Sequence, residues 1–118
     1  MEKRGHLDAS LLFDWYGELL TDRQRRMWRL YWLEDWSLSE ISQAEGISRA
    51  AVYDGLERVK VLLRDYEAKL GLVAAWQRRR QAFSALRAAL QASSETGDLR
   101  QVWAAYERMA AEEGLSDV

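Results

Sequence analysis

Apolar side chains recur at steps of three and four residues along the whole chain, which is the spacing of one face of a helix. The alternation of apolar and polar residues that marks a half-buried strand is missing from every long window. Pro is absent and only seven residues are Gly, so the usual helix breakers are scarce. The pattern therefore predicts an all-α protein whose helices are joined by short turns.

The first stripe of apolar residues predicts a helix over residues 8–19. Its members are Leu11, Leu12, Trp15, Tyr16 and Leu19. Directly after it, Thr21 and Gln24 form a capping-box pair, in which each side chain bonds the other residue's backbone N–H. A second helix is therefore predicted from this pair to about Leu33.

The stretch "SLSEISQAEGISRAAVYDGLERVK" predicts two helices joined by a tight turn. Ser37 and Glu40 repeat the capping-box pair at its start. Gly46 suits the left-handed conformation that ends a helix, and Ser48 caps the next one. Ser42 and Gly46 are small enough for the two helices to cross steeply. The buried contacts between them are assigned to Ile41, Ile47 and Val52. This combination predicts a helix-turn-helix.

The helix that follows Ser48 is longer than a groove-reading helix needs. It is predicted to run to about Leu70, where Gly71 ends it. One side carries an a/d seam of Val52, Leu56, Val59, Leu63, Tyr66 and Leu70. Such a seam requires a cover, either the first helix and the segment beyond residue 72 or a second copy of the chain in a homodimer.

Two further helices are predicted in the C-terminal part, over residues 72–91 and 99–114, on either side of the turn "SSETGD". Their apolar stripes are Trp76, Phe83, Leu86 and Leu90, followed by Leu99, Val102, Trp103, Tyr106 and Met109. We therefore predict a helix-turn-helix domain over residues 1–71. Residues 72–118 are predicted to be a C-terminal helical extension packed on the same core.

Composition argues against several classes of function. The chain has no Cys and one His, so no thiolate or His-cluster metal site is expected, and no cofactor. It has no Gly-rich phosphate loop and no nucleophile elbow, so we do not expect an enzyme. No apolar run is long enough to cross a bilayer, and the N-terminal residues lack the apolar core of a secretion signal, so a cytoplasmic protein is expected.

The second helix of the motif carries the residues that would face a DNA groove, because Val52 and Leu56 must face the core. These residues are Ser48, Arg49, Ala50, Tyr53, Asp54 and Glu57. Arg49 alone is cationic, and acidic side chains near phosphates oppose counterion release. Asp54 is expected to pair with Arg58 one turn along. With a formal net charge of −2 for the whole chain, specific DNA binding is predicted to be weak.

Two basic clusters are candidates for contact with phosphate or with an acidic partner. The first consists of Arg23, Arg25, Arg26 and Arg29, and the second of Arg78, Arg79 and Arg80. Three consecutive residues span about 200° of a helix, so at most two of the second cluster can serve one contact. Ordinary solvated helix faces also carry such runs, so this interpretation of both clusters stays open.

Three tryptophans lie near the first basic cluster. Trp28 and Trp32 are one helical turn apart, and Trp36 follows in the next turn region. They form an exposed apolar patch for a protein or a nucleic-acid base if their neighbours already fill the inward face. The alternative is that they pack against the C-terminal extension.

The segment from Leu11 to Leu72 resembles the YlxM-like family of bacterial helix-turn-helix proteins. The resemblance rests on "LLFDWYG", "LLTDRQ", "SLSEI", "ISRAAVYD" and "DYEAKLGL". That family is similar to the DNA-binding region four of sigma factors, and its members are encoded beside the protein component of the signal recognition particle. Ser42 and Gly55 depart from the usual pattern, and Gly55 costs about 1 kcal/mol of helix propensity relative to Ala.

The resemblance implies an accessory or regulatory role in the signal recognition particle pathway, through contact with the protein or RNA component of the particle. In sigma-like folds the helix ahead of the motif approaches the phosphate backbone, which would give the first basic cluster a role. The alternative is a sequence-specific DNA-binding transcriptional regulator that reads bases with Ser48, Arg49, Ala50 and Tyr53. A third interpretation is a structural adaptor whose helix-turn-helix no longer binds nucleic acid.

Overall fold

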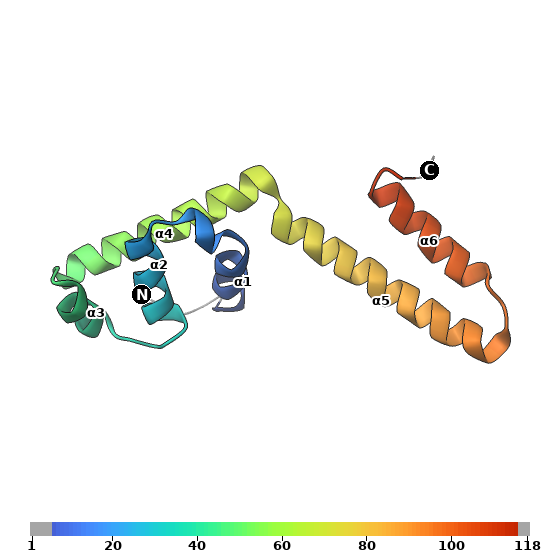
Figure 1. Cartoon of the computed structure of the whole chain (residues 1–118), viewed down its shortest axis with the longest axis horizontal. Helices are drawn as coiled ribbons and strands as arrows, with labels where there is room; N and C mark the ends of the chain where they lie inside the picture. The colour runs from blue at the N-terminus through green and yellow to red at the C-terminus, as the bar shows by residue number, and fades with distance from the viewer. Residues whose placement is uncertain (1–5, 116–118) are drawn as a thin grey trace. The chain divides into compact units, whose positions relative to one another are not determined.

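The computed structural model of the chain describes residues 6–115 and contains helices and turns but no strand over that range (Figure 1). Its elements are α1 His6–Tyr16, the 3-10 turn η1 Gly17–Leu19, α2 Asp22–Trp32, α3 Leu38–Glu45, α4 Arg49–Leu70, α5 Leu72–Thr96 and α6 Arg100–Glu112. The prediction of an all-α fold is confirmed.

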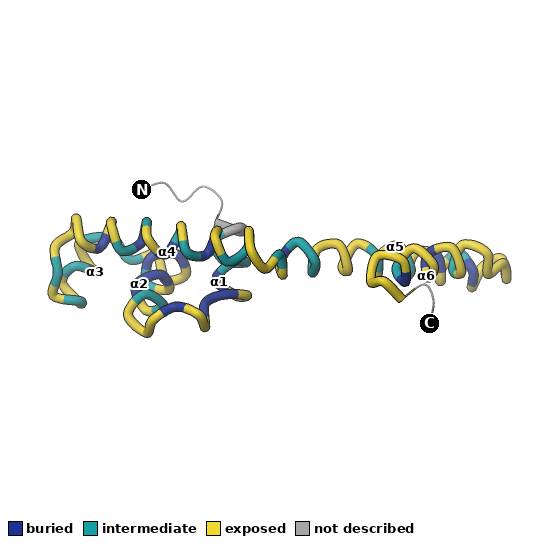
Figure 2. Tube along the Cα trace, turned by 90° about the horizontal axis from the view of Figure 1, so that it is seen from above, coloured by how far each residue is buried: buried dark blue, intermediate teal, exposed yellow. Residues whose placement is uncertain are grey.

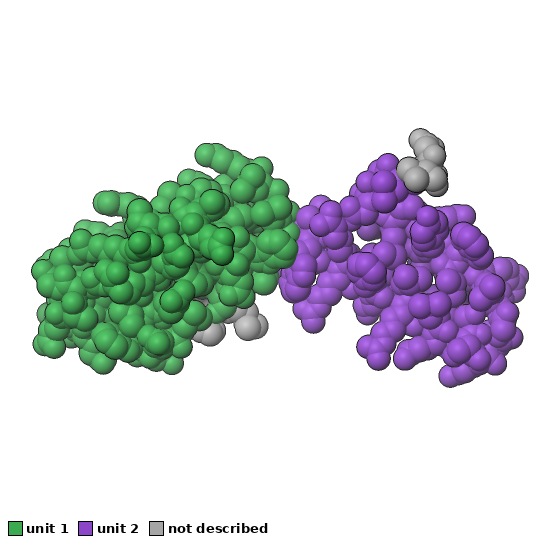
Figure 3. Space-filling view, viewed as in Figure 1, with its two compact units in different colours: residues 1–73 green, residues 74–118 purple. Residues whose placement is uncertain are grey.

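The chain forms two compact units, residues 1–73 and 74–118 (Figure 3). The first, which we call the helix-turn-helix unit, contains α1 to α4 and the start of α5. The second, the C-terminal hairpin, contains the rest of α5 and α6. The division falls two residues beyond the predicted boundary at residue 71. That the C-terminal part packs on the core of the first unit stays a prediction.

Local capping signals place three of the helix ends. In the Thr21 box the Gln24 N–H lies 3.2 Å from Thr21 Oγ1, and the Thr21 N–H lies 3.0 Å from Gln24 Oε1. The Ser37 and Glu40 box has both bonds at 3.1 Å. Gly46 ends α3 with φ 69°, in the left-handed region that Gly adopts without strain. The capping predictions are confirmed.

The first helix differs from its predicted form. α1 ends at Tyr16, and the chain tightens into η1, so Leu19 is 56% exposed and Leu20 is buried in its place. Phe13, which was absent from the predicted stripe, belongs to the core. The tightening needs a small residue at position 17, since a Cβ on Gly17 would lie 3.2 Å from the Phe13 ring. Placing Leu19 in the core was therefore wrong.

The core of the helix-turn-helix unit surrounds α4, which contacts α1, α2 and α3 (Figure 2). Its buried members are Phe13, Tyr16, Leu20, Met27, Trp28, Tyr31, Trp32, Ile41, Val52, Leu56, Val59, Leu63 and Val73. The seam on α4 thus has a cover within the chain, and its length no longer requires a second copy. Only Leu70, the last predicted seam position, is 55% exposed.

Trp28 and Trp32 are buried in this core, at 1% and 4% exposure, with their rings 5.5 Å apart. Both predictions for these residues were therefore wrong. The two indoles do not form an exposed patch, and they are buried by the core of their own unit. The physical reason is that α2 has packed neighbours on several sides, so its apolar face is wide and includes Met27 and Tyr31 as well. Trp36 is half-buried against the same core.

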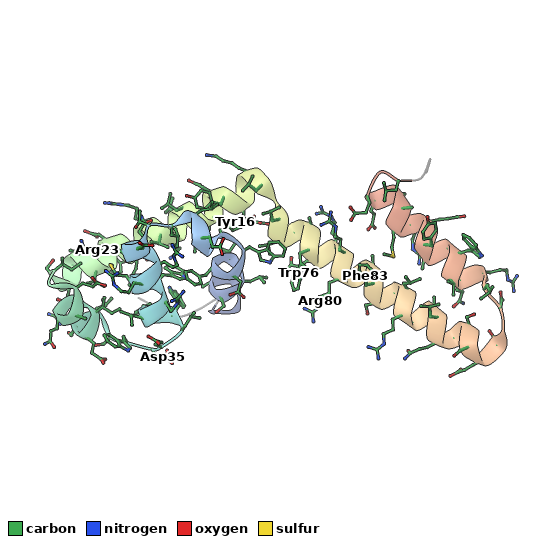
Figure 4. All side chains as sticks on the ribbon, in the orientation of Figure 1. Tyr16, Arg23, Asp35, Trp76, Arg80 and Phe83 are labelled. Carbon is green, nitrogen blue, oxygen red and sulfur yellow. The ribbon has the colours of Figure 1, made fainter. Side chains whose placement is uncertain are left out.

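A polar network that the sequence did not reveal holds the start of α5. The Tyr16 hydroxyl donates to Glu67 Oε1 and accepts from the Leu72 N–H at 3.1 Å (Figure 4). Glu67 Oε1 also accepts from the Val73 N–H at 3.0 Å. Burial raises the pKa of the Tyr16 hydroxyl, and its hydrogen bond to Glu67 raises it further. The network satisfies two of the N–H groups that the first turn of a helix leaves without partners.

In the C-terminal hairpin α5 is longer than predicted. It continues to Thr96, and Gly97 at φ 75° ends it. The residues "SSET" were expected in a turn, but the hydroxyls of Ser94 and Thr96 bond back to helix carbonyls, at 2.7 and 3.2 Å, and Ser93 is buried. Hydroxyl side chains that bond this way are compatible with the end of a helix. The prediction of a turn from Ser93 was therefore wrong.

Candidate partner-binding surface of the helix-turn-helix

The two helices of the motif enclose an open groove with a volume of about 410 Å³. Its walls are the start of α3, with Ser37, Leu38 and Ser39, and the first turns of α4, with Arg49, Ala50, Tyr53 and Asp54. We call it the α3–α4 groove. Its position follows from the tight turn, in which the Ser42 hydroxyl donates to the Ile47 carbonyl and fixes α3 against the start of α4.

Three of the predicted readout residues, Arg49, Ala50 and Tyr53, line this groove. Arg49 and Ala50 are exposed, and Tyr53 is 42% exposed. Ser48 is exposed as well, but its hydroxyl accepts from the Ala51 N–H at 3.0 Å and serves as the N-cap of α4. The groove can therefore offer a partner one guanidinium, one phenol and an apolar floor.

Asp54, an acidic residue of α4, also lines the groove. The predicted pair of Asp54 with Arg58 is not formed, and over the described range Asp54 has no ion-pair partner. Glu57 instead lies 3.5 Å from Lys60, one turn further on. An unpaired carboxylate at the groove opposes the approach of phosphate.

The first basic cluster is largely engaged within the unit. Arg26 donates two hydrogen bonds to Glu45, at 2.6 and 2.9 Å. This bond lowers the pKa of the Glu45 carboxyl below its ordinary value and raises the pKa of Arg26. Arg25 pairs with Asp22 at 3.1 Å, and the Arg29 guanidinium lies 5.9 Å from the centre of the Phe13 ring. Arg23, which is exposed, has no hydrogen-bonded partner in the described range (Figure 4).

The second basic cluster lies in the C-terminal hairpin and does not act as one patch there. Arg79 donates two bonds to Glu113, at 2.6 and 2.9 Å, which tie α5 to the end of α6. The Arg80 guanidinium lies 5.4 Å from the centre of the Trp76 ring (Figure 4). Arg78 lines a separate hollow of about 340 Å³ with Arg108 and Glu112. The three side chains thus have three different surroundings.

Gly55 lies where α4 packs closely against the Met27 side chain of α2. A Cβ on Gly55 would lie 3.0 Å from Cε of Met27, so the missing side chain allows α2 to lie close to α4. Sequence reasoning noted Gly55 only as a loss of helix propensity. Its role depends on a contact between residues 28 positions apart, which no local signal reports.

The charge of the helix-turn-helix unit is unfavourable for nucleic acid. Residues 1–73 contain 11 Lys and Arg and 13 Asp and Glu, a formal net charge of −2. Proteins that bind nucleic acid through such a motif usually concentrate Lys and Arg on the binding side. Here most arginines of α2 already have carboxylate or aromatic partners.

Two other findings bear on the class of the protein. Over the described residues, no three His, Cys, Asp or Glu side chains lie close enough to hold a metal ion. None of the described helices combines the length and the apolar character needed to cross a membrane.

The fold and the groove define a helix-turn-helix protein. Residues 1–102 match the family described as "Putative helix-turn-helix protein, YlxM / p13 like", UPF0122, and the chain belongs to this family. The family is one of helix-turn-helix proteins and not an enzyme family. The match reaches through α5 into α6, further than the motifs noticed in the sequence, which end at Leu72.

Curated relatives agree with this assignment. The UPF0122 protein of Symbiobacterium thermophilum is 49% identical over 81 residues, which are 69% of this chain and 76% of the relative. The UPF0122 protein of Halalkalibacterium halodurans is 43% identical over 91 residues, 75% of this chain and 84% of the relative. The UPF0122 protein YlxM of Bacillus subtilis is 38% identical over 100 residues, 85% of this chain and 91% of the relative.

Proposed function

We propose that this chain is an accessory or regulatory protein of the signal recognition particle pathway in the cytoplasm and that it acts by binding a component of the particle through the α3–α4 groove. The link to the pathway rests on the family, whose resemblance implies it. The choice of the groove rests on its position, because it lies where helix-turn-helix proteins present their first recognition residues.

The single observation that favours a protein component over RNA is the charge of the unit. Sequence-independent binding of nucleic acid draws most of its affinity from Lys and Arg that neutralise phosphates. In this unit Arg26 is already held by Glu45, and Asp54 lies in the groove itself. A protein segment that carries a carboxylate for Arg49 and an apolar side chain for the groove near Tyr53 meets these conditions better.

Binding assays with separated components test the proposal. The purified protein component, the particle RNA and a random DNA duplex are each titrated with the full chain at physiological salt. We expect binding to the protein component, and affinity for the duplex no better than about 10⁻⁵ M, the range of non-specific binders. Arg49→Glu should weaken protein binding at least about 10-fold.

The matched control is Arg64→Glu, which makes the same charge change at another exposed position of α4 outside the groove. It should leave binding unchanged. If no component of the particle binds, the pathway assignment is wrong. If the particle protein binds equally well after Arg49→Glu, another surface is responsible.

A second candidate function is the DNA-binding regulator. The observation in its favour is that Arg49, Ala50 and Tyr53 share the side of α4 that enters the major groove in such proteins. It predicts a tight, sequence-specific complex with one duplex, which Arg49→Glu abolishes and Arg64→Glu does not. Selection of duplexes from a random pool would find that sequence.

A further inference from the structure

The C-terminal hairpin has one strongly apolar face. On α6, Leu99, Trp103 and Tyr106 follow one another at steps of four and three residues, so they form a single stripe. They are 56%, 61% and 51% exposed, and the rings of Trp103 and Tyr106 meet edge to face with centroids 6.0 Å apart. On α5, Phe83 and Leu90 are seven residues apart and are 60% and 51% exposed.

The stripes of α5 and α6 lie on the same face of the hairpin. Arg79 is one turn before Phe83 and therefore on the same side of α5, and Glu113 is two turns after Tyr106 and on the same side of α6. The Arg79–Glu113 ion pair brings these two sides together. Phe83 and Met109 also line one small hollow of about 240 Å³ with this pair.

The opposite face of the hairpin is polar. Its hollow between the helices is lined by Arg78, Gln81, Arg108 and Glu112 together with Met109 and three alanines. Between α5 and α6 the buried residues are the small Ala89, Ser93 and Ala105, and Met109 is half-buried beside them. The large apolar residues of the two stripes therefore form one continuous exposed surface on one face of the hairpin.

We propose that this face is a homodimer interface in which α6 packs antiparallel against α6 of a second copy. The argument for a second copy, as opposed to an unrelated partner, is that the face is complementary to itself about a two-fold axis. An axis midway between Trp103 and Tyr106 places Trp103 of each copy against Tyr106 of the other. It also places Leu99 against the small Ala110 of the other copy.

The charges beside the stripe follow the same symmetry. Arg100 and Glu107 are seven residues apart and lie on the same flank of the stripe. In an antiparallel pair, Arg100 of each copy lies opposite Glu107 of the other, which gives two attractive pairs and no like-charge contact. The Arg100 side chain is 89% exposed although it contacts Asp98, and Glu107 has no ion-pair partner in the described part of the chain.

Phe83 and Leu90 on α5 are also arranged symmetrically about the proposed two-fold axis. The Arg79–Glu113 pair sets the register of the hairpin, so the level midway between Trp103 and Tyr106 falls beside residues 87 and 88 of α5. The midpoint between Phe83 and Leu90 is about one residue, or about 1.5 Å, from that level. One two-fold axis therefore places Phe83 of each copy against Leu90 of the other while it pairs the α6 helices.

The area of the face is of the right size for a dimer. Five large apolar side chains that are each about half exposed offer on the order of 100 Å² each, or about 500 Å² per copy. A standard interface takes about 800 Å² from each partner, so these residues would supply more than half of it. The result would be a four-helix arrangement of two hairpins, which is a stable way to cover such stripes.

Sedimentation equilibrium of the full chain at micromolar concentrations tests the dimer. We expect a species of twice the 13.7 kDa chain mass. Trp103→Glu should raise the dissociation constant at least about 100-fold, because a buried charge would be left without a partner. Ala104→Glu adds the same charge at the neighbouring exposed position, off the stripe, and should leave the dimer intact. A monomer up to about 100 μM, or a dimer that Trp103→Glu does not weaken, would overturn the proposal.

Charge reversal tests the antiparallel register without removing an apolar residue. Arg100→Glu and Glu107→Arg should each weaken the homodimer, since each places like charges opposite one another twice. Mixed in equal amounts, the two variants should form a heterodimer in preference to either homodimer, because both pairs then become attractive. Native mass spectrometry measures the three species. A statistical mixture of them would contradict the proposed register.

Discussion

The helix-turn-helix unit and the C-terminal hairpin use their apolar residues in opposite ways. In the first, aromatic and branched side chains from four helices meet around α4, and Trp28 and Tyr16 are each 1% exposed. In the hairpin the Trp, Tyr and Phe residues at positions 103, 106 and 83 are more than half exposed, and the residues that are buried are Ala and Ser.

The difference in buried apolar area indicates which of the two units is stable within a single chain. Stabilisation grows with the apolar area removed from water, so the helix-turn-helix unit has a core sufficient to hold its groove in place. Two helices that meet mainly through small side chains bury little area, and an isolated helix as short as α6, with 13 residues, is marginal in water. The hairpin is therefore expected to depend on a second surface, while the groove residues do not.

The largest expected effect is a difference in unfolding free energy between substitutions of Trp28 and of Trp103. Trp28→Ala should lower the free energy of unfolding by about 3–5 kcal/mol, because it leaves a cavity in the core. Trp103→Ala should change it by less than about 1 kcal/mol in dilute solution, where the hairpin is not paired. Urea titrations followed by circular dichroism give both values. Equal losses would show that the comparison between the units is wrong.

The next effect concerns the network at the start of α5. Tyr16→Phe removes the hydroxyl that joins Glu67 to the Leu72 N–H, and it should cost about 1–3 kcal/mol because buried polar groups lose their partner. Tyr53→Phe is the matched control, since its hydroxyl has no hydrogen bond in the described range, and should cost less than about 0.5 kcal/mol. Thermal unfolding of the two variants measures the difference.

A smaller effect is expected at the contact of Gly55 with Met27. Gly55→Ala gains about 1 kcal/mol of helix propensity, but the new Cβ meets Met27 Cε at 3.0 Å. The gain should therefore appear in full only when Met27→Ala removes the obstacle. A double-mutant cycle in urea measures the coupling. If Gly55→Ala stabilises both backgrounds equally, the close approach is not a constraint.

The smallest effect is a pH dependence from Glu45. Its pKa is lower in the folded chain than in the unfolded one because Arg26 donates hydrogen bonds to it. The pair therefore contributes stability above the unfolded pKa of about 4.3 and loses that contribution as pH falls through the lower folded pKa. Glu45→Gln should reduce the urea midpoint slightly at pH 7. The difference from the native chain should shrink toward pH 3; a difference that grows there would reverse the sign assigned to the pair.

Features encoded by neighbouring residues could be predicted from the sequence. The capping boxes at Thr21 and Ser37 and the left-handed Gly46 each depend on residues within four positions, and they set the helix-turn-helix. The groove residues Arg49, Ala50 and Tyr53 followed from the direction of Val52 and Leu56, which the core does bury.

Features that depend on tertiary packing could not be predicted. The burial of Trp28 and Trp32 depends on how many helices surround α2, which a single periodic stripe does not report. The pairing of Arg26 with Glu45 joins residues 19 positions apart, so a run of arginines resembled a free basic patch. Ser93 and Thr96 have a turn-like composition, yet they remain helical because hydroxyl bonds and burial support the last turn of α5.

Amide hydrogen exchange of the full chain at low and high protein concentration tests the difference between the two units most directly. Amides of α2 and α4 should show the same strong protection at both concentrations, since their core lies within one chain. Amides of α6, residues 100–112, should exchange rapidly when the chain is dilute and become protected as concentration rises. Protection of α6 equal to that of α4 at all concentrations would contradict the account.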